Sequence, residues 1–282
     1  MSVESEAARI FDHIDKACNV DKRALTPLFK VGCDEVPYHA GTAFGIELSG
    51  VKYLVTAAHV FDKDESNDCD SKNEIFCFSE GKLKQIARFD LLHARKNGGL
   101  VDMAVVTPRD VEIESIFEEF FAESDFELGD VRTDQYVAAC GFPATKNKVR
   151  WGTTQLTQAP YAYCGRASAP SVCVRAGFDA ATHFCFDIFL KKTFTARQKE
   201  IRAPDPHGIS GGPVFVIHDF SDAATLMKPK LRGIVVEQKP YDRVVACVKI
   251  EVVVEAIRQA PRPPTGVEMV ERSLSWDSGL EP

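Results

Sequence analysis

Three short segments of the sequence carry residues that together could do nucleophilic and acid–base chemistry. Ser210 lies in the run PHGISGGP, His59 follows the run LVTAA, and Asp102 lies in LVDMAVV. A serine hydroxyl is a poor nucleophile until a base removes its proton. Its attack on a carbonyl also creates an oxyanion that hydrogen-bond donors must stabilise. A histidine and a carboxylate are the groups that activate such a serine, so the three segments predict acyl transfer when the fold brings them together.

The serine segment has the glycines that this chemistry needs. Gly208 can adopt a backbone conformation that other residues resist, and can so turn amide N–H groups toward one point. Gly211 and Gly212 leave room for the backbone of a substrate. The alternative interpretation is a tight turn between two strands.

The histidine and the aspartate each have a structural alternative when taken alone. His59 follows an apolar strand and two alanines, so it could project from a strand end into a cleft or be a structural histidine. Asp102 stands at the start of an apolar strand, where burying a carboxylate is costly unless it is hydrogen-bonded. Its alternative role is that of a turn aspartate that caps the strand.

The elements that must position these residues are short strands in two series. Gly, Asp and Asn separate short apolar runs, which predicts strands and turns. Because a similar number recurs in each half, we expect an all-β protein of two tandem β-barrels. The first series is LFKVG, GTAFGIEL, KYLVTAAHVF, EIFCFS and LVDMAVVTP, and the second is QYVAACGF, VRWGTTQLT, SVCVRAGF, HFCFDIFLKKTF, GGPVFVI, LRGIVV and RVVACVKI.

Helical patterns lie at the two ends and in the middle of the chain. Apolar residues at helical spacing predict a short helix over 4–18, and a closing helix is expected over 250–259. The acidic stretch 111–125 is helix-like and is expected to bridge the halves. We predict an N-terminal helical segment (1–29), a first barrel (30–140), a second barrel (141–260) and a flexible Pro-rich tail (261–282).

Composition and charge exclude several classes of protein. The 282 residues are 45% apolar and 27% charged, as in ordinary globular proteins. A formal net charge of −7 argues against a nucleic-acid partner, which favours a basic surface. The N-terminus has neither the basic start nor the apolar run of a signal peptide. No apolar stretch approaches the roughly 18 residues of a membrane span, so we expect a cytoplasmic protein without a membrane partner.

The nine cysteines fit a reducing compartment. Their number is odd, their spacing is irregular, and no C-x-x-C pair occurs, so neither a disulfide framework nor a zinc ribbon is indicated. We expect free, mostly buried thiols, no metal site and no cofactor. They are Cys18, Cys33, Cys69, Cys77, Cys140, Cys164, Cys173, Cys185 and Cys247.

Taken together, the segments LVTAAH59, VD102MAVV and G208IS210GGPV resemble the three signature blocks of the trypsin/chymotrypsin family, in the same order. The resemblance extends to Leu231–Val235, similar to a strand of that family's specificity pocket, and covers about residues 30–260. It implies the chymotrypsin fold of two six-stranded β-barrels and a serine endopeptidase that acts on proteins or peptides through an acyl-enzyme. It also implies Ser210 as nucleophile, His59 as base, Asp102 as its orienting acid, and the N–H groups of Gly208 and Ser210 as the oxyanion hole.

Three residues depart from the family pattern. Ile209 replaces the aspartate that pairs with a freshly cut N-terminus in digestive members, so activation by cleavage is not expected. Val60 replaces a cysteine beside the histidine, which suits a reducing compartment. Val236 replaces a serine that contacts the aspartate, so Asp102 must find other partners.

The resemblance assigns the specificity pocket to five residues. Pro204 and Asp205 fall at its base, and Val236, Glu237 and Gln238 on its wall. An acidic pocket would favour Arg or Lys before the cleaved bond through charge pairing. Alternatively, Asp205 and Glu237 are solvated loop carboxylates.

Two other functions remain open from the sequence. A catalytically silent relative could use the cleft to bind a peptide or a protein, although it would not need all three polar residues. An esterase with the same groups is also possible, but the α/β-hydrolase order Ser, Asp, His is absent. A cytoplasmic protease without a cleavage switch needs a regulator, so we expect a regulatory protein partner. Bacterial proteases of this kind often accompany stress or antiviral defence systems.

Overall fold

A computed structural model gives the structure of the chain over most of its length. It describes residues 22–31, 37–62, 75–79, 82–86, 89–96, 99–108, 112–133, 135–148, 159–188, 193–194, 200–201, 203–217, 229–260 and 272–276. The helix expected over 4–18 and the strand expected from VRWGTTQLT lie outside these residues.

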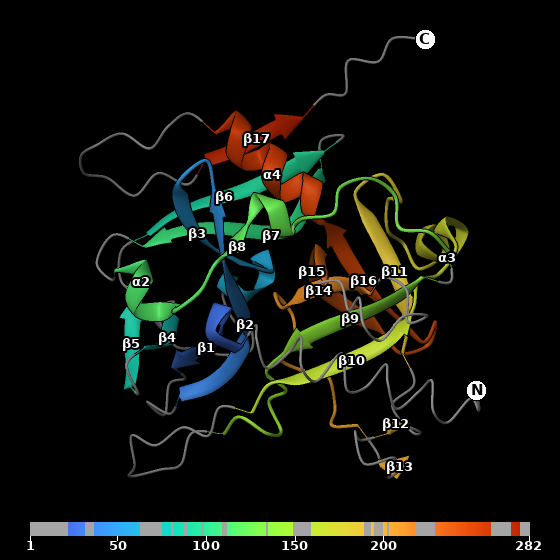
Figure 1. The fold of residues 1–282 in the computed structure, drawn as a ribbon, viewed down its shortest axis with the longest axis horizontal. Helices are drawn as coiled ribbons and strands as arrows, with labels where there is room; N and C mark the ends of the chain where they lie inside the picture. Colours follow the sequence, from blue (N-terminus) through green and yellow to red (C-terminus); the bar gives the residue numbers. More distant parts are fainter. Residues whose placement is uncertain are drawn as a thin grey trace.

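Strands of the first part of the chain, together with one short strand near its end, form a large and mostly antiparallel sheet (Figure 1). Its order is β17-β6-β7-β3-β2-β1-β4-β5, and β8 pairs in parallel with β2. The short strand β17 pairs in parallel with β6, within the segment 261–282 that the sequence predicts as a tail. The strands are β1 (Leu25–Val31), β2 (Pro37–Leu48), β3 (Val51–Thr56), β4 (Ile75–Ser79), β5 (Lys82–Ile86), β6 (Phe89–Lys96), β7 (Gly99–Pro108), β8 (Phe121–Ala122) and β17 (Arg272–Trp276).

The second part forms a six-stranded sheet of order β10-β9-β14-β15-β16-β11. This sheet is curled, so that its two edge strands, β10 and β11, approach each other. Ala167, which follows β10, forms a bridge with Phe186 on β11. A Cβ added to Gly165 would lie 1.8 Å from the Asp187 oxygen, so only glycine permits this approach. The strands are β9 (Tyr136–Gly141), β10 (Tyr161–Arg166), β11 (His183–Asp187), β14 (Pro213–Ile217), β15 (Lys230–Lys239) and β16 (Val244–Lys249); β12 (Thr193–Phe194) and β13 (Glu200–Ile201) form a separate ribbon.

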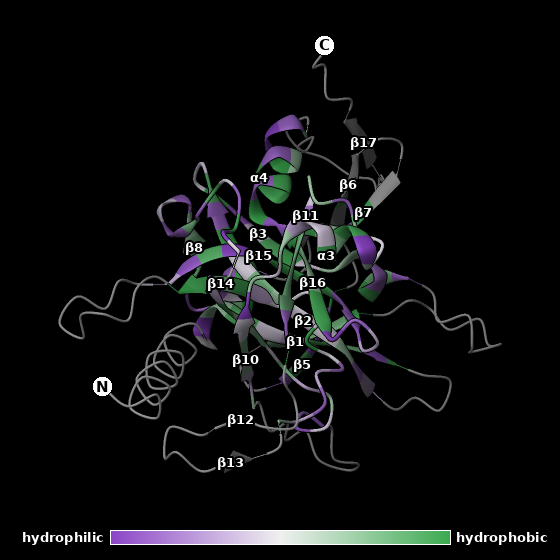
Figure 2. Cartoon of the chain, turned by 90° about the vertical axis from the view of Figure 1, so that its right-hand side faces the viewer, coloured by the Kyte–Doolittle hydropathy of each residue, from purple (hydrophilic) through white to green (hydrophobic). Residues whose placement is uncertain are grey.

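The described helices are short and lie outside the sheets. The closing helix α4 (Ile250–Gln259) has the bounds that the sequence predicts, and it packs against strands of both sheets. Its apolar and hydrophilic faces are visible in Figure 2. The others are η1 (Lys22–Ala24), η2 (Ala58–Phe61), α2 (Ile113–Ile116), η3 (Glu123–Asp125) and α3 (Pro170–Arg175).

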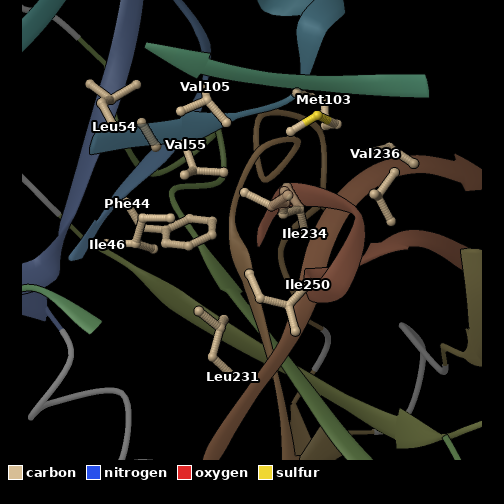
Figure 3. Packing of buried hydrophobic residues seen from close by; sticks show 14 of the residues in the cluster. Phe44, Ile46, Leu54, Val55, Met103, Val105, Leu231, Ile234, Val236 and Ile250 are labelled. Atoms are coloured by element: carbon tan, nitrogen blue, oxygen red, sulfur yellow. The ribbon is translucent and has the colours of Figure 1, made fainter. Parts of the chain in front are cut away.

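A shared core joins the two sheets. Buried side chains of β2, β3 and β7 pack with those of β15 and α4 in one cluster (Figure 3). Each Å² of apolar surface that such a core removes from water stabilises the folded state by roughly 25 cal/mol. The labelled members are Phe44, Ile46, Leu54, Val55, Met103, Val105, Leu231, Ile234, Val236 and Ile250. The core therefore holds the sheets against each other, and segments from both can meet at one site.

The all-β fold class is confirmed, since most described elements are strands and the helices are few. The division into two barrels of the chymotrypsin type stays a prediction. The boundaries predicted at 30 and 140 fall inside β1 and β9, because the first sheet begins at Leu25 and the second at Tyr136.

Two local predictions were wrong. SVCVRAGF, expected as a strand, is mostly helix α3, because Pro170 occupies the first helical turn and Cys173 is buried while Val174 is 60% exposed. The described part of 111–125 is not one helix. It divides into α2, β8 and η3, because Phe121 and Ala122 are extended and pair as strand β8 with Ile46 and Glu47 of β2.

Candidate active site

The neighbouring strands β3 and β7 bring His59 and Asp102 together. Thr56 at the end of β3 pairs with Ala104 on β7, so the residues that follow Thr56 lie opposite Asp102. His59 stands in the one-turn helix η2, directly after the strand. The Lys30 ammonium donates a hydrogen bond of 2.5 Å to the backbone oxygen of Asp62, which follows η2. The histidine is thus held at a strand end by contacts on both sides.

Asp102 makes two hydrogen bonds to His59. Its Oδ2 lies 2.7 Å from the ring Nδ1, and its Oδ1 accepts the His59 backbone N–H at 2.9 Å. Because an ionised carboxylate can only accept, Nδ1 must carry the proton. The neutral ring therefore presents the lone pair of Nε2, and 41% of the side chain is exposed. This is the tautomer that a general base for a serine needs.

The hydrogen bond between the two side chains also sets their pKa values. It raises the pKa of His59 above 6.5, with burial opposing the change and the charge of Asp102 adding to it. Burial by itself would raise the pKa of Asp102. The hydrogen bonds from His59 and from the backbone outweigh burial and hold that pKa below its ordinary value. The contacts favour a charged Asp102 beside a histidine ready to accept a proton.

Ser210 lies in a loop that is fixed between the two sheets. Its carbonyl oxygen accepts the Thr42 N–H at 2.8 Å, and Thr42 Oγ1 donates to the Gly208 oxygen at 2.9 Å. On the other side, the Gly211 N–H donates to the Val235 oxygen at 2.7 Å. The loop thereby connects β2 of the first sheet with β15 of the second.

Close backbone contacts bring this loop next to the histidine segment. A Cβ on Gly211 would lie 2.1 Å from Thr56 Oγ1 and 2.9 Å from the Ala57 nitrogen. Ser210 is therefore adjacent to the residues that lead into His59. Within the described residues, the Ser210 hydroxyl makes no hydrogen bond, to His59 or to another group. Bonds between a catalytic serine and its base are often long until a substrate binds.

Two amide groups of the serine loop differ from their neighbours, which are hydrogen-bonded within the loop. Ile209 N–H donates to the Pro206 oxygen and Gly212 N–H to the Ile209 oxygen. Across the described part of the chain, the N–H groups of Gly208 and Ser210 have no acceptor. Gly208 has φ +95°, as the third residue of a type II turn requires. Two free donors beside one serine can stabilise an oxyanion.

Sequence reasoning missed two residues that support this loop. Thr42 is fully buried, and its hydroxyl also accepts the Phe142 N–H at 3.0 Å. The His39 ring packs behind Gly208, where an added Cβ would lie 2.6 Å from His39 Nδ1. Both His39 ring nitrogens are buried without a partner in the described structure, and burial lowers the pKa of His39 to about 4. A threonine within the small and apolar run AGTAFGI of β2 was the available signal for Thr42, since a buried hydroxyl needs partners.

The five predicted pocket residues lie on two segments, the loop that leads to Ser210 and strand β15. The backbone oxygens of Pro204 and Asp205 accept hydrogen bonds from Tyr163, and Asp205 Oδ1 accepts the His207 N–H at 2.9 Å. The carboxylate of Glu237 is 2.5 Å from the Lys239 ammonium.

The two wall residues beside Glu237 differ in burial. Val236 is buried in the core at a bulge of β15, and Gln238 is half-buried. The carboxylates of Asp205 and Glu237 are therefore each bonded to a group of the protein itself, the His207 N–H and the Lys239 ammonium. This favours loop carboxylates over a pocket that selects a cation.

The remaining sequence predictions concern thiols, metals and membranes. The cysteines that the structure describes are free thiols, buried except for the half-buried Cys164, while Cys18, Cys33 and Cys69 lie outside the described residues. Within the described ranges, no three His, Cys, Asp or Glu side chains gather as metal ligands would. No helix in those ranges has the length and apolar character needed to cross a membrane. No protein-family model and no curated protein sequence matches the chain.

Proposed function

We propose that the protein is a serine endopeptidase of the trypsin/chymotrypsin type. Ser210 would be the nucleophile, His59 the general base and Asp102 the group that orients it. The observation that carries the proposal is the hydrogen-bonded His59–Asp102 pair, held beside a serine loop in which two amides have no acceptor among the described residues. A turn between strands needs neither feature, so the combination favours catalysis over the structural alternatives.

Each step of peptide hydrolysis has a candidate group. His59 Nε2 takes the proton of the Ser210 hydroxyl as the oxygen attacks the peptide carbonyl, and the oxyanion accepts hydrogen bonds from the Gly208 and Ser210 amides. The imidazolium, stabilised by Asp102, then gives its proton to the leaving amine. Water hydrolyses the acyl-enzyme by the same steps, with His59 again as the base. The groups needed are side chains and amides of the chain itself.

The proposal includes the fold of that family. The curled second sheet would correspond to its second barrel and the first sheet to its first barrel. The arrangement of the site supports this, since His59 and Asp102 come from the first sheet and Ser210 from a loop that enters β14 of the second. A cytoplasmic location, a regulatory protein partner and a role in stress or defence stay predictions from the sequence.

A fluorophosphonate probe tests the proposal, because it reacts with an activated serine. We expect the wild type to be labelled at Ser210 and to hydrolyse a casein or peptide substrate. Ser210→Ala should lose labelling, and Ser210→Ala and His59→Ala should each lose at least about 10³-fold in turnover while remaining folded. Ser171→Ala, which changes an exposed serine on α3, is the matched control and should keep full activity.

Three results would contradict the proposal. Labelling or turnover that survives in Ser210→Ala would show that another residue is the nucleophile. A folded wild type that neither reacts with the probe nor cleaves peptides would favour the silent binding module. Turnover of small esters without peptide cleavage would favour the esterase.

A further inference from the structure

The side chain of Asn147 is buried, although nothing in the proposed reaction uses it. It is 1% exposed, and its amide is bonded at both ends. Nδ2 donates to the Pro143 oxygen at 2.8 Å and to the Ala159 oxygen at 3.2 Å, and Oδ1 accepts the Ala159 N–H at 2.8 Å. These partners fix the orientation of the amide, because its nitrogen faces two acceptors and its oxygen faces a donor.

The Pro143 oxygen belongs to the same peptide unit as the Ala144 N–H. That N–H donates to the His207 oxygen at 2.8 Å. The His207 oxygen in turn belongs to the same peptide unit as the Gly208 N–H, one of the two unpaired donors of the serine loop. In a trans peptide the C=O and N–H point in opposite directions. A chain of hydrogen bonds therefore runs from Asn147 through two peptide planes and ends at the Gly208 N–H.

The orientation of the peptide between His207 and Gly208 is not fixed by Gly208 itself. Type I and type II turns differ by a rotation of this central peptide, and a glycine tolerates both. In the other orientation the oxygen of His207, and not the N–H of Gly208, would point toward the oxyanion position. The hydrogen bond from Ala144 holds the His207 oxygen on the opposite side. Hydrogen bonds in such a chain also polarise one another, which strengthens the last donor.

We propose that Asn147 is a positioning residue that keeps the Gly208 N–H directed at the oxyanion, acting through the peptides of Ala144 and Gly208. This inference rests on the proposed function. The side chain of Asn147 does not touch the substrate. Its effect is to hold the Pro143–Ala144 peptide, which in turn holds the donor.

The test compares Asn147→Ala with the wild type in peptide hydrolysis. Removing one oxyanion donor outright typically costs about 10²–10³-fold in kcat, so a donor that is no longer held in place should cost about 10-fold or more. KM should change little. Binding of a peptide aldehyde, whose adduct with the serine puts an oxygen at the oxyanion position, should weaken in parallel with kcat. Binding of the matching peptide amide, which forms no adduct, should not weaken.

Two further variants separate this effect from loss of structure. Lys146→Ala changes an exposed side chain of the same loop and should behave as wild type. Ala144→Pro removes the N–H that donates to His207 and places the ring Cδ where that hydrogen pointed, so the His207 oxygen must move away. The φ of proline itself suits Ala144, the second residue of a turn closed by the Lys146 N–H and the Pro143 oxygen. The loss of kcat in Ala144→Pro should equal or exceed that of Asn147→Ala.

A crystal structure of Asn147→Ala gives a measurement that does not depend on activity. We expect the His207–Gly208 peptide to be rotated or present in two orientations. Wild-type kcat in a folded Asn147→Ala, equal weakening of aldehyde and amide binding, or an unchanged peptide would each overturn the inference. A wild type without any reaction at Ser210 would instead refute the proposed function, and the peptide orientation would still decide the role of Asn147.

Discussion

At the scale of single residues, hydrogen bonding prevails over burial at the candidate site. Burial alone would raise the pKa of Asp102 and lower that of His59, and so favour a neutral pair. The short contact between the two side chains reverses both effects. The second carboxylate oxygen of Asp102 also accepts a hydrogen bond from the His59 backbone N–H. The resemblance predicted other partners for Asp102 because Val236 takes the place of a serine, and the partners found in the described structure are these bonds to His59.

Replacing Asp102 should change both the rate and its pH dependence. Asp102→Asn loses the carboxylate that fixes the tautomer, so kcat/KM should fall by about 10⁴-fold. In the wild type, kcat/KM should decline as the pH falls through the raised pKa of His59, because the protonated ring cannot act as a base. Without the carboxylate that pKa is lower, so the acidic limb of the pH–rate profile should move to lower pH.

Asp62→Asn is the matched control for this experiment. The charge of Asp62 also raises the pKa of His59, but Asp62 makes no hydrogen bond to the ring in the described structure. We expect a small shift of the acidic limb in the same direction and little loss of rate. An Asp102→Asn profile with an unchanged or higher apparent pKa would show that the carboxylate does not control the base.

At the scale of elements, the serine loop depends on a glycine that lets two strands approach it. Gly211 has φ +86°, and a Cβ there would lie 2.1 Å from the Thr42 oxygen and 2.1 Å from Thr56 Oγ1. Thr56 Oγ1 itself donates to the Thr42 oxygen at 2.7 Å, so the two neighbours cannot move independently. The loop can reach β2 and β3 only without a side chain at this position.

Gly177 offers a control with a similar backbone and free space. Its φ is +92°, and a Cβ would meet nothing within 4 Å. Gly177→Ala should therefore cost only the backbone strain, about 1–3 kcal/mol. Gly211→Ala should add overpacking of about 1–3 kcal/mol or more and should move Ser210 away from His59. Urea unfolding and peptide turnover measure both effects, and equal losses of stability in the two variants would contradict the predicted contact.

At the scale of the whole molecule, a buried arginine joins the second sheet to the closing helix. Arg232 on β15 is 1% exposed and bonds both oxygens of Glu251 on α4, at 2.5 and 3.2 Å. It also donates to the Glu127 oxygen at 2.9 Å, in the segment that connects the two sheets. Because α4 also packs against β6 and β7 of the first sheet, this contact links three parts of the fold.

Removing the partner of a buried charge is costly, because the charge is left without compensation. Breaking a buried pair costs about 3–5 kcal/mol. Glu251 is 29% exposed, so we expect Glu251→Ala to lower the free energy of unfolding by an amount near the lower end of that range. Glu255→Ala, on the same helix and bonded only to Gln259 among the described residues, should cost less than about 1 kcal/mol. Chemical unfolding tests this, and similar losses in both variants would show that the Arg232 contact contributes little.

Local patterns in the sequence were enough to indicate the three polar segments of the site and the positions of most strands and of the closing helix. Residue types and their alternation are local properties, so the bounds of α4 and the strands around His59 and Asp102 were predictable. Local pattern failed at SVCVRAGF, because a short apolar run fits a strand or a buried helix face equally well. It failed also at 111–125, where consecutive aromatic residues pack on different neighbours.

The assembly of the candidate site depends on contacts between segments that are far apart in the sequence. Asp102 bonds a histidine 43 residues away, and Thr42 bonds the oxygen of Gly208 across 166 residues. The peptide that carries the Gly208 N–H is likewise bonded to a distant segment, since the Ala144 N–H donates to the His207 oxygen. Such contacts leave no periodic trace in the sequence, because a hydrogen bond between distant segments requires only one suitable atom at each end and a fold that brings the two together.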